Sequence, residues 1–116
     1  MERMKIYHNP RCQTSRTVLK MLQEKGLEPE VVLYLENPPG EKEIRAILKG
    51  AGIKAIDLVR RKEPIARELA IGTQDYSEAA LIKLMVKHPI LIERPVVMKG
   101  RKALLARPPE KMRELL

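Results

Sequence analysis

Two apolar stretches near the start of the chain, separated by one amphipathic stretch, restrict the fold more than any other feature. Residues 5–7 favour a short strand, and residues 30–35, EVVLYL, predict a second strand that is buried on both faces. Between them, apolar residues recur with helical spacing over 13–25, and Gly26 follows as a stop signal. Strand, helix and strand in this order predict a right-handed βαβ unit with two parallel strands.

The C-terminal part of the chain predicts more sheet. Residues 90–92 form a short apolar run that we expect to be extended. Residues 96–98 and 102–105 flank a glycine turn and predict an antiparallel hairpin. The next break is Arg107-Pro108-Pro109, after which a last helix is expected from Pro109 to Leu116.

Helices are predicted between these two regions, after a break at Asn37-Pro38-Pro39-Gly40. Pro64 is suited to the first position of a helix, and Ser77 to the N-cap of another. The expected helices cover residues 41–49, 55–61, 64–69 and 78–87.

This order of elements predicts an α/β fold of the thioredoxin or glutaredoxin type, with a mixed sheet and a helical insertion. We expect a single domain, 1–116, with its core in about 1–40 and 88–116 and the insertion in about 41–87. In such a core, Pro95 would occupy the position of the cis-proline beside the active thiol.

The composition is that of a folded protein and excludes several functions. Hydrophobic residues make up 44% of the chain and charged residues 33%, which are values of globular domains. No apolar run approaches the ~20 residues that cross a membrane, and the charged start predicts no signal peptide. Since a lone cysteine cannot form an internal disulfide, we expect the reducing cytoplasm.

The net charge of +8 suggests nucleic-acid binding, but the aromatic content argues against it. Aromatic residues make up only 3% of the chain, too few for a base-stacking surface. The basic residues are spread along the sequence, which favours a surface that attracts small anions. His8 and His88 lie far apart and a second cysteine is absent, so we expect no metal site. Nothing suggests more than a monomer.

The residues around Cys12 favour a reactive thiol. Cys12 lies where the strand at 5–7 gives way to the helix that starts at Gln13. Free N–H groups and the helix dipole at such a position stabilise an anion, and lower the pKa of cysteine from about 8.5 to roughly 3.5–7.5. A lone cysteine is more often a small buried hydrophobic residue. Here, however, its neighbours are polar or basic, namely Arg11, Gln13, Thr14, Ser15 and Arg16.

Three arginines, Arg60, Arg94 and Arg107, lie at the ends of predicted elements. In a thioredoxin-like core, Arg94 and Arg107 return to the edge of the sheet at which the helix after Cys12 begins. Guanidinium groups bind tetrahedral oxyanions through two parallel hydrogen bonds, a geometry that lysine does not reproduce. Any one arginine is most simply a surface residue, and only a family resemblance singles out these three.

The sequence resembles the glutaredoxin-coupled arsenate reductases, the ArsC family, and especially its branch of arsenate reductase-like proteins. The matching stretches span nearly the whole chain. They are IYHNPRCQTSR at 6–16, EPEVVLYLENPP at 28–39, LVRRKEP at 58–64, HPILIERPVVMKG at 88–100 and ARPPE at 106–110.

The resemblance implies a thioredoxin-like fold and one nucleophile, Cys12. It implies that His8 helps to keep the thiol ionised and that the Ser15 hydroxyl can donate a hydrogen bond to the thiolate. Arg61 adjoins one of the three family arginines and could take its role. The oxyanion is implied to bind the guanidinium groups of Arg60, Arg94 and Arg107.

The implied reaction is the reduction of arsenate, or a similar oxyanion, to arsenite. The Cys12 thiolate attacks arsenate, glutathione attacks the adduct as a co-substrate, and glutaredoxin completes the cycle without a bound cofactor. Because the chain has no second cysteine, an external thiol is required.

Two other functions remain open at this point. An Spx-type transcription-regulating adaptor, which binds RNA polymerase, shares the fold but commonly carries Cys-x-x-Cys, where this chain has Cys12-x-x-Ser15. A general glutathione-dependent thiol oxidoreductase would use the same cysteine without needing the arginines.

Overall fold

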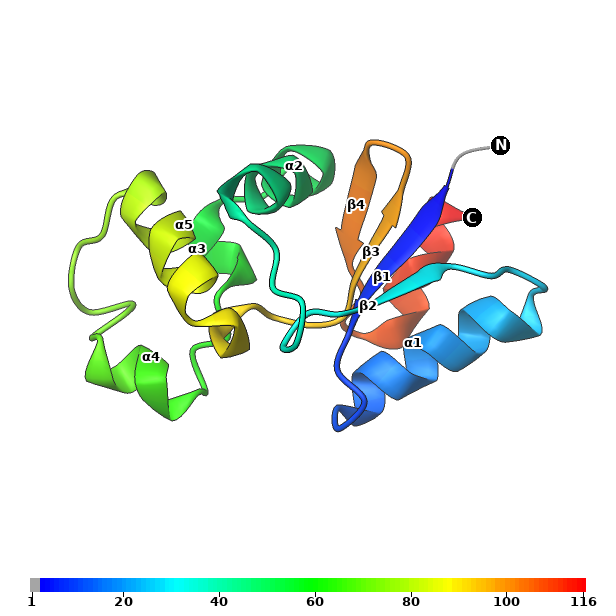
Figure 1. Cartoon of the computed structure of the whole chain (residues 1–116), viewed down its shortest axis with the longest axis horizontal. Coiled ribbons are helices and arrows are strands. Elements are labelled where there is room, and N and C mark those ends of the chain that lie inside the picture. The colour runs from blue at the N-terminus through cyan, green and yellow to red at the C-terminus, as the bar shows by residue number, and fades with distance from the viewer. Residues whose placement is uncertain (1–2) are drawn as a thin grey trace.

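The computed structural model describes residues 3–116, which fold around a four-stranded sheet with the strand order β2-β1-β3-β4 (Figure 1). β1 pairs in parallel with β2 and antiparallel with β3, which in turn pairs antiparallel with β4. The predicted βαβ unit and the C-terminal hairpin are therefore confirmed. The strands are β1 Met4–His8, β2 Glu30–Leu33, β3 Val96–Lys99 and β4 Lys102–Leu105.

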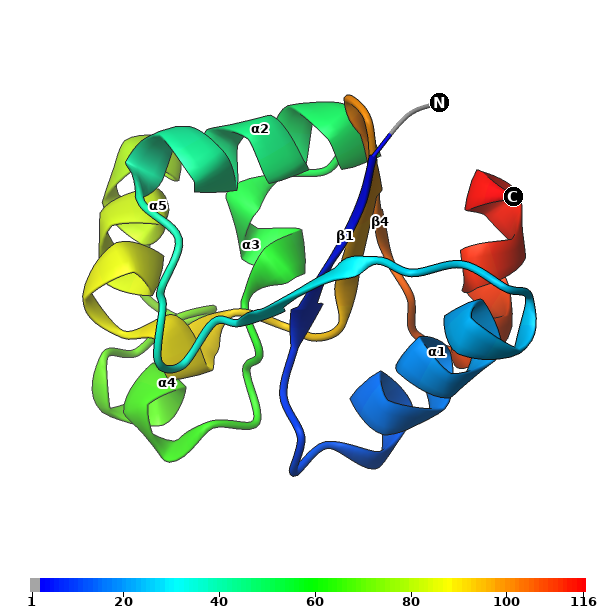
Figure 2. The same ribbon diagram turned by 45° about the vertical axis from the view of Figure 1, so that its right-hand side comes forward.

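Helices cover both faces of the sheet, as expected for the thioredoxin-like α/β fold with a helical insertion (Figures 1 and 2). α1 and the C-terminal 3-10 helix η2 lie on one side, and the inserted helices lie on the other. No helix among residues 3–116 is long and apolar enough to cross a membrane. The helices are α1 Gln13–Glu24, α2 Glu41–Ala51, α3 Ala55–Leu58, α4 Pro64–Glu68, α5 Glu78–Lys87, η1 Pro89–Leu91 and η2 Pro109–Leu115.

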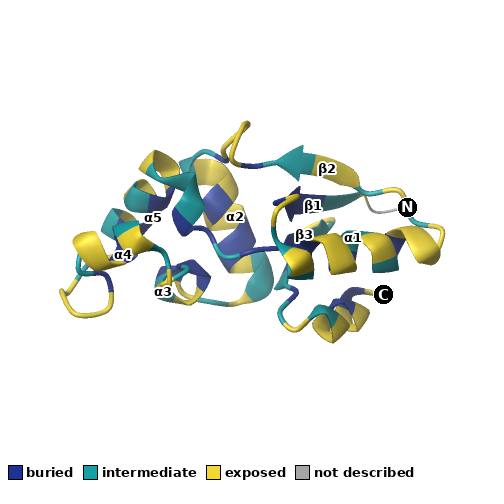
Figure 3. Ribbon diagram, turned by 90° about the horizontal axis from the view of Figure 1, so that it is seen from below, coloured by how far each residue is buried: buried dark blue, intermediate teal, exposed yellow. Residues whose placement is uncertain are grey.

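The alternation of side chains along the central strands separates two apolar clusters. Tyr7 and Val96 point into the larger cluster, which the inserted helices cover. Ile6 and Val97 point into the smaller cluster, which α1 and η2 cover. Figure 3 shows buried residues on β1 and β3 and on the inner sides of the helices. The sheet is therefore held from both sides, and its strand ends are fixed relative to α1.

The prediction that residues 30–35 are buried on both faces is wrong. β2 ends at Leu33 and lies at the edge of the sheet, where β1 is its one neighbour within residues 3–116, and Val31 is 43% exposed. Beyond Leu33 the chain turns, because the N–H groups of Glu36 and Asn37 both donate to its carbonyl oxygen. A β-branched composition indicates strand propensity, but whether a strand is central depends on distant partner strands.

The prediction of an extended run at 90–92 holds only for Ile92, because residues 90 and 91 lie in a short helix. Pro89 opens the short helix η1, since proline has the backbone φ of a first helical turn. Ile92, the residue that follows η1, pairs with Val59 in an isolated antiparallel bridge. The N–H of Arg60 donates to the Leu91 carbonyl at 2.7 Å. The predicted helix at 55–61 ends early, at Leu58, because the chain is extended there for this pairing.

Candidate active site

Cys12 is the N-cap residue of α1, at the junction that the sequence predicts. The turn before it is closed by the Cys12 N–H, which donates to the Asn9 carbonyl at 3.0 Å. The side-chain oxygen of Asn9 accepts the N–H of Arg11 at 3.0 Å, a local turn typical of asparagine. The half-buried sulfur is therefore presented at the open end of a helix.

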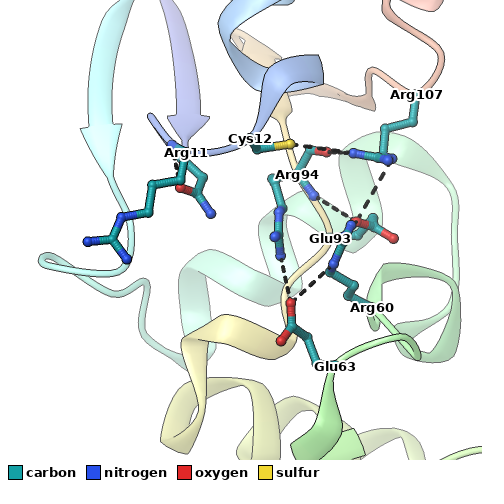
Figure 4. A network of polar contacts seen from close by, with 8 residues as sticks. Arg11, Cys12, Arg60, Glu63, Glu93, Arg94 and Arg107 are labelled. Atoms are coloured by element: carbon teal, nitrogen blue, oxygen red, sulfur yellow. Dashed lines mark hydrogen bonds and ion pairs between the residues drawn. The ribbon is translucent and has the colours of Figure 1, made fainter.

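The surroundings lower the pKa of the Cys12 thiol. Burial alone would raise it, but the backbone N–H of Ser15 and the guanidinium groups of Arg94 and Arg107 stabilise the thiolate more. Nη1 of Arg107 lies 3.7 Å from the sulfur (Figure 4). Cys12 therefore ionises at a lower pH than an unperturbed cysteine.

Alkylation of Cys12 by iodoacetamide tests this ionisation. Only the thiolate reacts, so the rate rises through the pKa of the thiol. Because that pKa is lowered in the folded protein, we expect the rate to level off at a lower pH than in the same chain unfolded in urea. Rate profiles of the folded and unfolded chain that coincide would contradict the stabilisation of the thiolate.

The side chains of His8 and Ser15 hold the loop that leads from β1 to Cys12. Nδ1 of His8 lies 2.7 Å from Oγ of Ser15, which also accepts the N–H of Asn9 at 3.1 Å. Burial lowers the pKa of His8, and the positive charge of Arg16 lowers it further, so the imidazole is neutral near pH 7. The side chain of Ser15 thus holds the loop, while its backbone N–H stabilises the thiolate.

The three family arginines converge from separate segments of the chain (Figure 4). Arg60 follows α3, Arg94 precedes the cis bond to Pro95 at the start of β3, and Arg107 follows β4. Nη1 of Arg107 donates to the Arg94 carbonyl at 3.0 Å, which fixes these two residues beside each other. The bridge that follows α3 brings Arg60 to the cluster. The β3–β4 hairpin brings Arg107 beside Arg94.

Neighbouring arginines do not join the cluster. Arg61, the alternative to Arg60, is exposed and its side chain lies beside Gly72. A Cβ atom built onto Gly72 would be 3.8 Å from the nearest side-chain atoms of Arg61. Figure 4 shows the Arg11 side chain directed away from Cys12. Arg16 donates to the Pro10 carbonyl at 2.8 Å. The structure therefore places Arg60, rather than Arg61, with the other two guanidinium groups.

Two glutamates that the sequence analysis did not single out hold the arginines in place. Oε1 of Glu93 accepts a hydrogen bond from Arg60 Nη1 at 2.9 Å and lies 3.9 Å from Arg107 Nε. Oε1 of Glu63 accepts from Arg60 Nε at 3.2 Å and from Arg94 Nη1 at 3.5 Å. Both lie within stretches that carry the family resemblance, at 58–64 and 88–100, but no local pattern marks a glutamate as an arginine partner.

Tyr34 is a further residue near the site that the sequence analysis did not single out. Its hydroxyl and Nε of Arg94 are buried, and neither has a hydrogen-bond partner among residues 3–116. Burial raises the pKa of Tyr34, partly offset by the positive charge of Arg94, while the negative charge of Cys12 raises it further. Tyr34 directly follows β2, whose carboxyl end lies beside that of its parallel neighbour β1, and this adjacency is the signal that could have identified it.

The arrangement combines a nucleophile with a receptor for an anion. The guanidinium groups can hold a tetrahedral oxyanion, and one of them, that of Arg107, contacts the sulfur that can act as a nucleophile. No group of three or more His, Cys, Asp or Glu side chains within residues 3–116 could hold a metal ion.

Comparisons with known proteins point to one protein family. A family model described as the ArsC family matches residues 7–115. An Escherichia coli protein named as uncharacterised, YfgD, is 47% identical over 99% of this chain and 98% of its own length. An arsenate reductase of Escherichia coli is 39% identical over all of this chain and 82% of its own length. The solved structure of an arsenate reductase from Vibrio cholerae superimposes with a TM-score of 0.94 at 38% identity, and covers 99% of this chain and 98% of its own.

Proposed function

This chain belongs to the ArsC family, and we propose that it reduces arsenate to arsenite through Cys12. The observation that carries the proposal is the contact between Arg107 Nη1 and the Cys12 sulfur, at 3.7 Å, within a cluster of three guanidinium groups. Relatives about 40% identical over most of their length are named arsenate reductases.

In the first step, the arginines hold arsenate against the thiolate despite the repulsion between two anions. Hydrogen bonds from Arg94 and Arg107 to the arsenate oxygens neutralise charge as the sulfur approaches arsenic. The sulfur–arsenic bond forms and a hydroxide leaves, so arsenic stays pentavalent in this adduct.

In the second step, arsenic needs two electrons. Glutathione displaces a second oxygen of the adduct as water and forms its own sulfur–arsenic bond, so arsenic is still pentavalent. A thiol of glutaredoxin then attacks the glutathione sulfur. The bonding pair between that sulfur and arsenic passes to arsenic, which becomes trivalent, and the two external thiols end as a mixed disulfide. Water displaces arsenite from Cys12 and regenerates the thiol.

External reductants are required in this scheme because Cys12 is the only cysteine of the sequence. Glutathione is thus a co-substrate rather than a bound cofactor, and glutaredoxin is a transient partner. A pool of reduced glutathione places the reaction in the cytoplasm, and one chain holds all the residues that the first step uses, so we propose a monomer as the working form.

Arsenate-dependent consumption of NADPH in the presence of glutathione, glutaredoxin and glutathione reductase tests the proposal. We expect NADPH consumption with all components and a return to background when arsenate, glutathione or glutaredoxin is omitted. Full activity without glutathione would contradict the proposed reductant, and no activity with any thiol donor would contradict arsenate reduction itself.

A further inference from the structure

Glu93 places a carboxylate inside the cluster that would bind the oxyanion. Its side chain is 20% exposed. One oxygen, Oε1, accepts from Arg60 Nη1 at 2.9 Å and from the backbone N–H of Arg94 at 3.4 Å, and lies 3.9 Å from Arg107 Nε. Glu93 thus engages two of the three guanidinium groups that the reaction needs (Figure 4).

The charges of the cluster cancel. Arg60, Arg94 and Arg107 contribute three positive charges, and these are balanced by the carboxylates of Glu63 and Glu93 and, in the thiolate form that attacks, by Cys12. An incoming oxyanion therefore meets no net positive charge and has to compete for hydrogen-bond donors that are already engaged.

Of the two carboxylates, Glu93 competes closer to the sulfur. Glu63 pairs with Arg60 and Arg94, and Figure 4 shows it at the opposite end of the network from Cys12. Glu93 instead pairs with Arg107, the guanidinium that contacts the sulfur. An oxyanion held by Arg107 against the sulfur therefore competes with Glu93 for that guanidinium.

We propose that Glu93 is a built-in anion that competes with every oxyanion for the arginines and weakens its binding. This inference rests on the proposed function. An anion such as phosphate has only hydrogen bonds and charge to offset the displacement of Glu93. Arsenate gains a sulfur–arsenic bond to Cys12 as hydroxide leaves, with no change of oxidation state.

Protection of Cys12 from iodoacetamide by inorganic phosphate measures this competition without any turnover. In Glu93→Gln, we expect the phosphate concentration that halves the alkylation rate to fall by about tenfold or more, the effect of freeing one charge-assisted hydrogen bond. Glu41→Gln is the matched control, because it removes the same charge from an exposed pair with Arg45 at 3.1 Å. That control is expected to stay within about twofold of wild type.

Two further variants separate charge from shape and folding. Glu93→Asp keeps the carboxylate and is expected to stay within about threefold of wild type. Glu93→Ala also removes the charge, and it repeats the test if Glu93→Gln is unstable. Circular dichroism checks that each variant is folded. Phosphate affinity that is unchanged in both charge-removing variants, or that rises as much in Glu93→Asp, would overturn the proposal.

The phosphate measurement also separates this inference from the proposed function. If wild type fails to reduce arsenate while Glu93→Gln gains affinity for phosphate, arsenate reduction is contradicted and the competition by Glu93 stands. If wild type reduces arsenate and Glu93→Gln gains no affinity for phosphate, only the role of Glu93 fails.

Discussion

Cys12→Ser is expected to abolish arsenate reduction, with a loss of about 10⁴-fold or more that reaches the background of the assay. A serine hydroxyl is not ionised near neutral pH, and oxygen cannot replace sulfur in passing electrons to arsenic. No other thiol exists in the chain to take over. The measurement is arsenate-dependent NADPH consumption with glutathione, glutaredoxin and glutathione reductase at saturating concentrations.

Unfolding cannot account for this loss, which makes the variant informative. Cys12 is the N-cap of α1, and its side chain makes no capping hydrogen bond. Serine is among the best N-cap residues, so Cys12→Ser should leave the free energy of unfolding unchanged or raise it by up to about 1 kcal/mol. A folded Cys12→Ser protein that still reduces arsenate under the same conditions would reject Cys12 as the nucleophile.

Arg107→Ala is expected to lower kcat/KM for arsenate by about 10²–10³-fold, the effect of removing one preorganised donor from a developing oxyanion. The variant also removes a cation that stabilises the thiolate. Since the pKa of Cys12 then rises, the rise in alkylation rate should move to higher pH together with the loss of activity.

Arg107→Lys separates the two effects. Lysine keeps the positive charge near the sulfur, so the pH profile of alkylation should stay closer to that of wild type than in Arg107→Ala. It lacks the paired donors of a guanidinium, so arsenate reduction should still fall. Arg45→Ala, on the exposed face of α2, is the control and should keep full activity. Activity of Arg107→Ala equal to that of this control would contradict a role for Arg107 in binding the oxyanion.

Local sequence patterns predicted the elements that carry the nucleophile. The switch from strand to helical spacing places Cys12 at the N-cap of α1, and the glycine turn predicts the hairpin that ends at Leu105, just before Arg107. These features depend on neighbours in sequence. The edge position of β2 does not, because it is set by which strands pair with β1.

The arginine cluster shows the same division between local and distant information. Nothing near Arg60 in the sequence indicates the bridge between Val59 and Ile92 that brings it beside Arg94. The family resemblance selected the arginines, but the carboxylates of Glu63 and Glu93 become visible only when three segments are brought together in space.

The proposed reduction of arsenate requires that a covalent bond forms between the sulfur of Cys12 and arsenic. Native mass spectrometry of the protein incubated with arsenate and glutathione, with glutaredoxin omitted, detects that bond most directly. We predict an arsenic-bearing species of the wild-type chain that Cys12→Ser does not form. Arsenic retained equally by both proteins, or a wild-type mass that stays unmodified in a preparation that reduces arsenate once glutaredoxin is added, would contradict attack by Cys12.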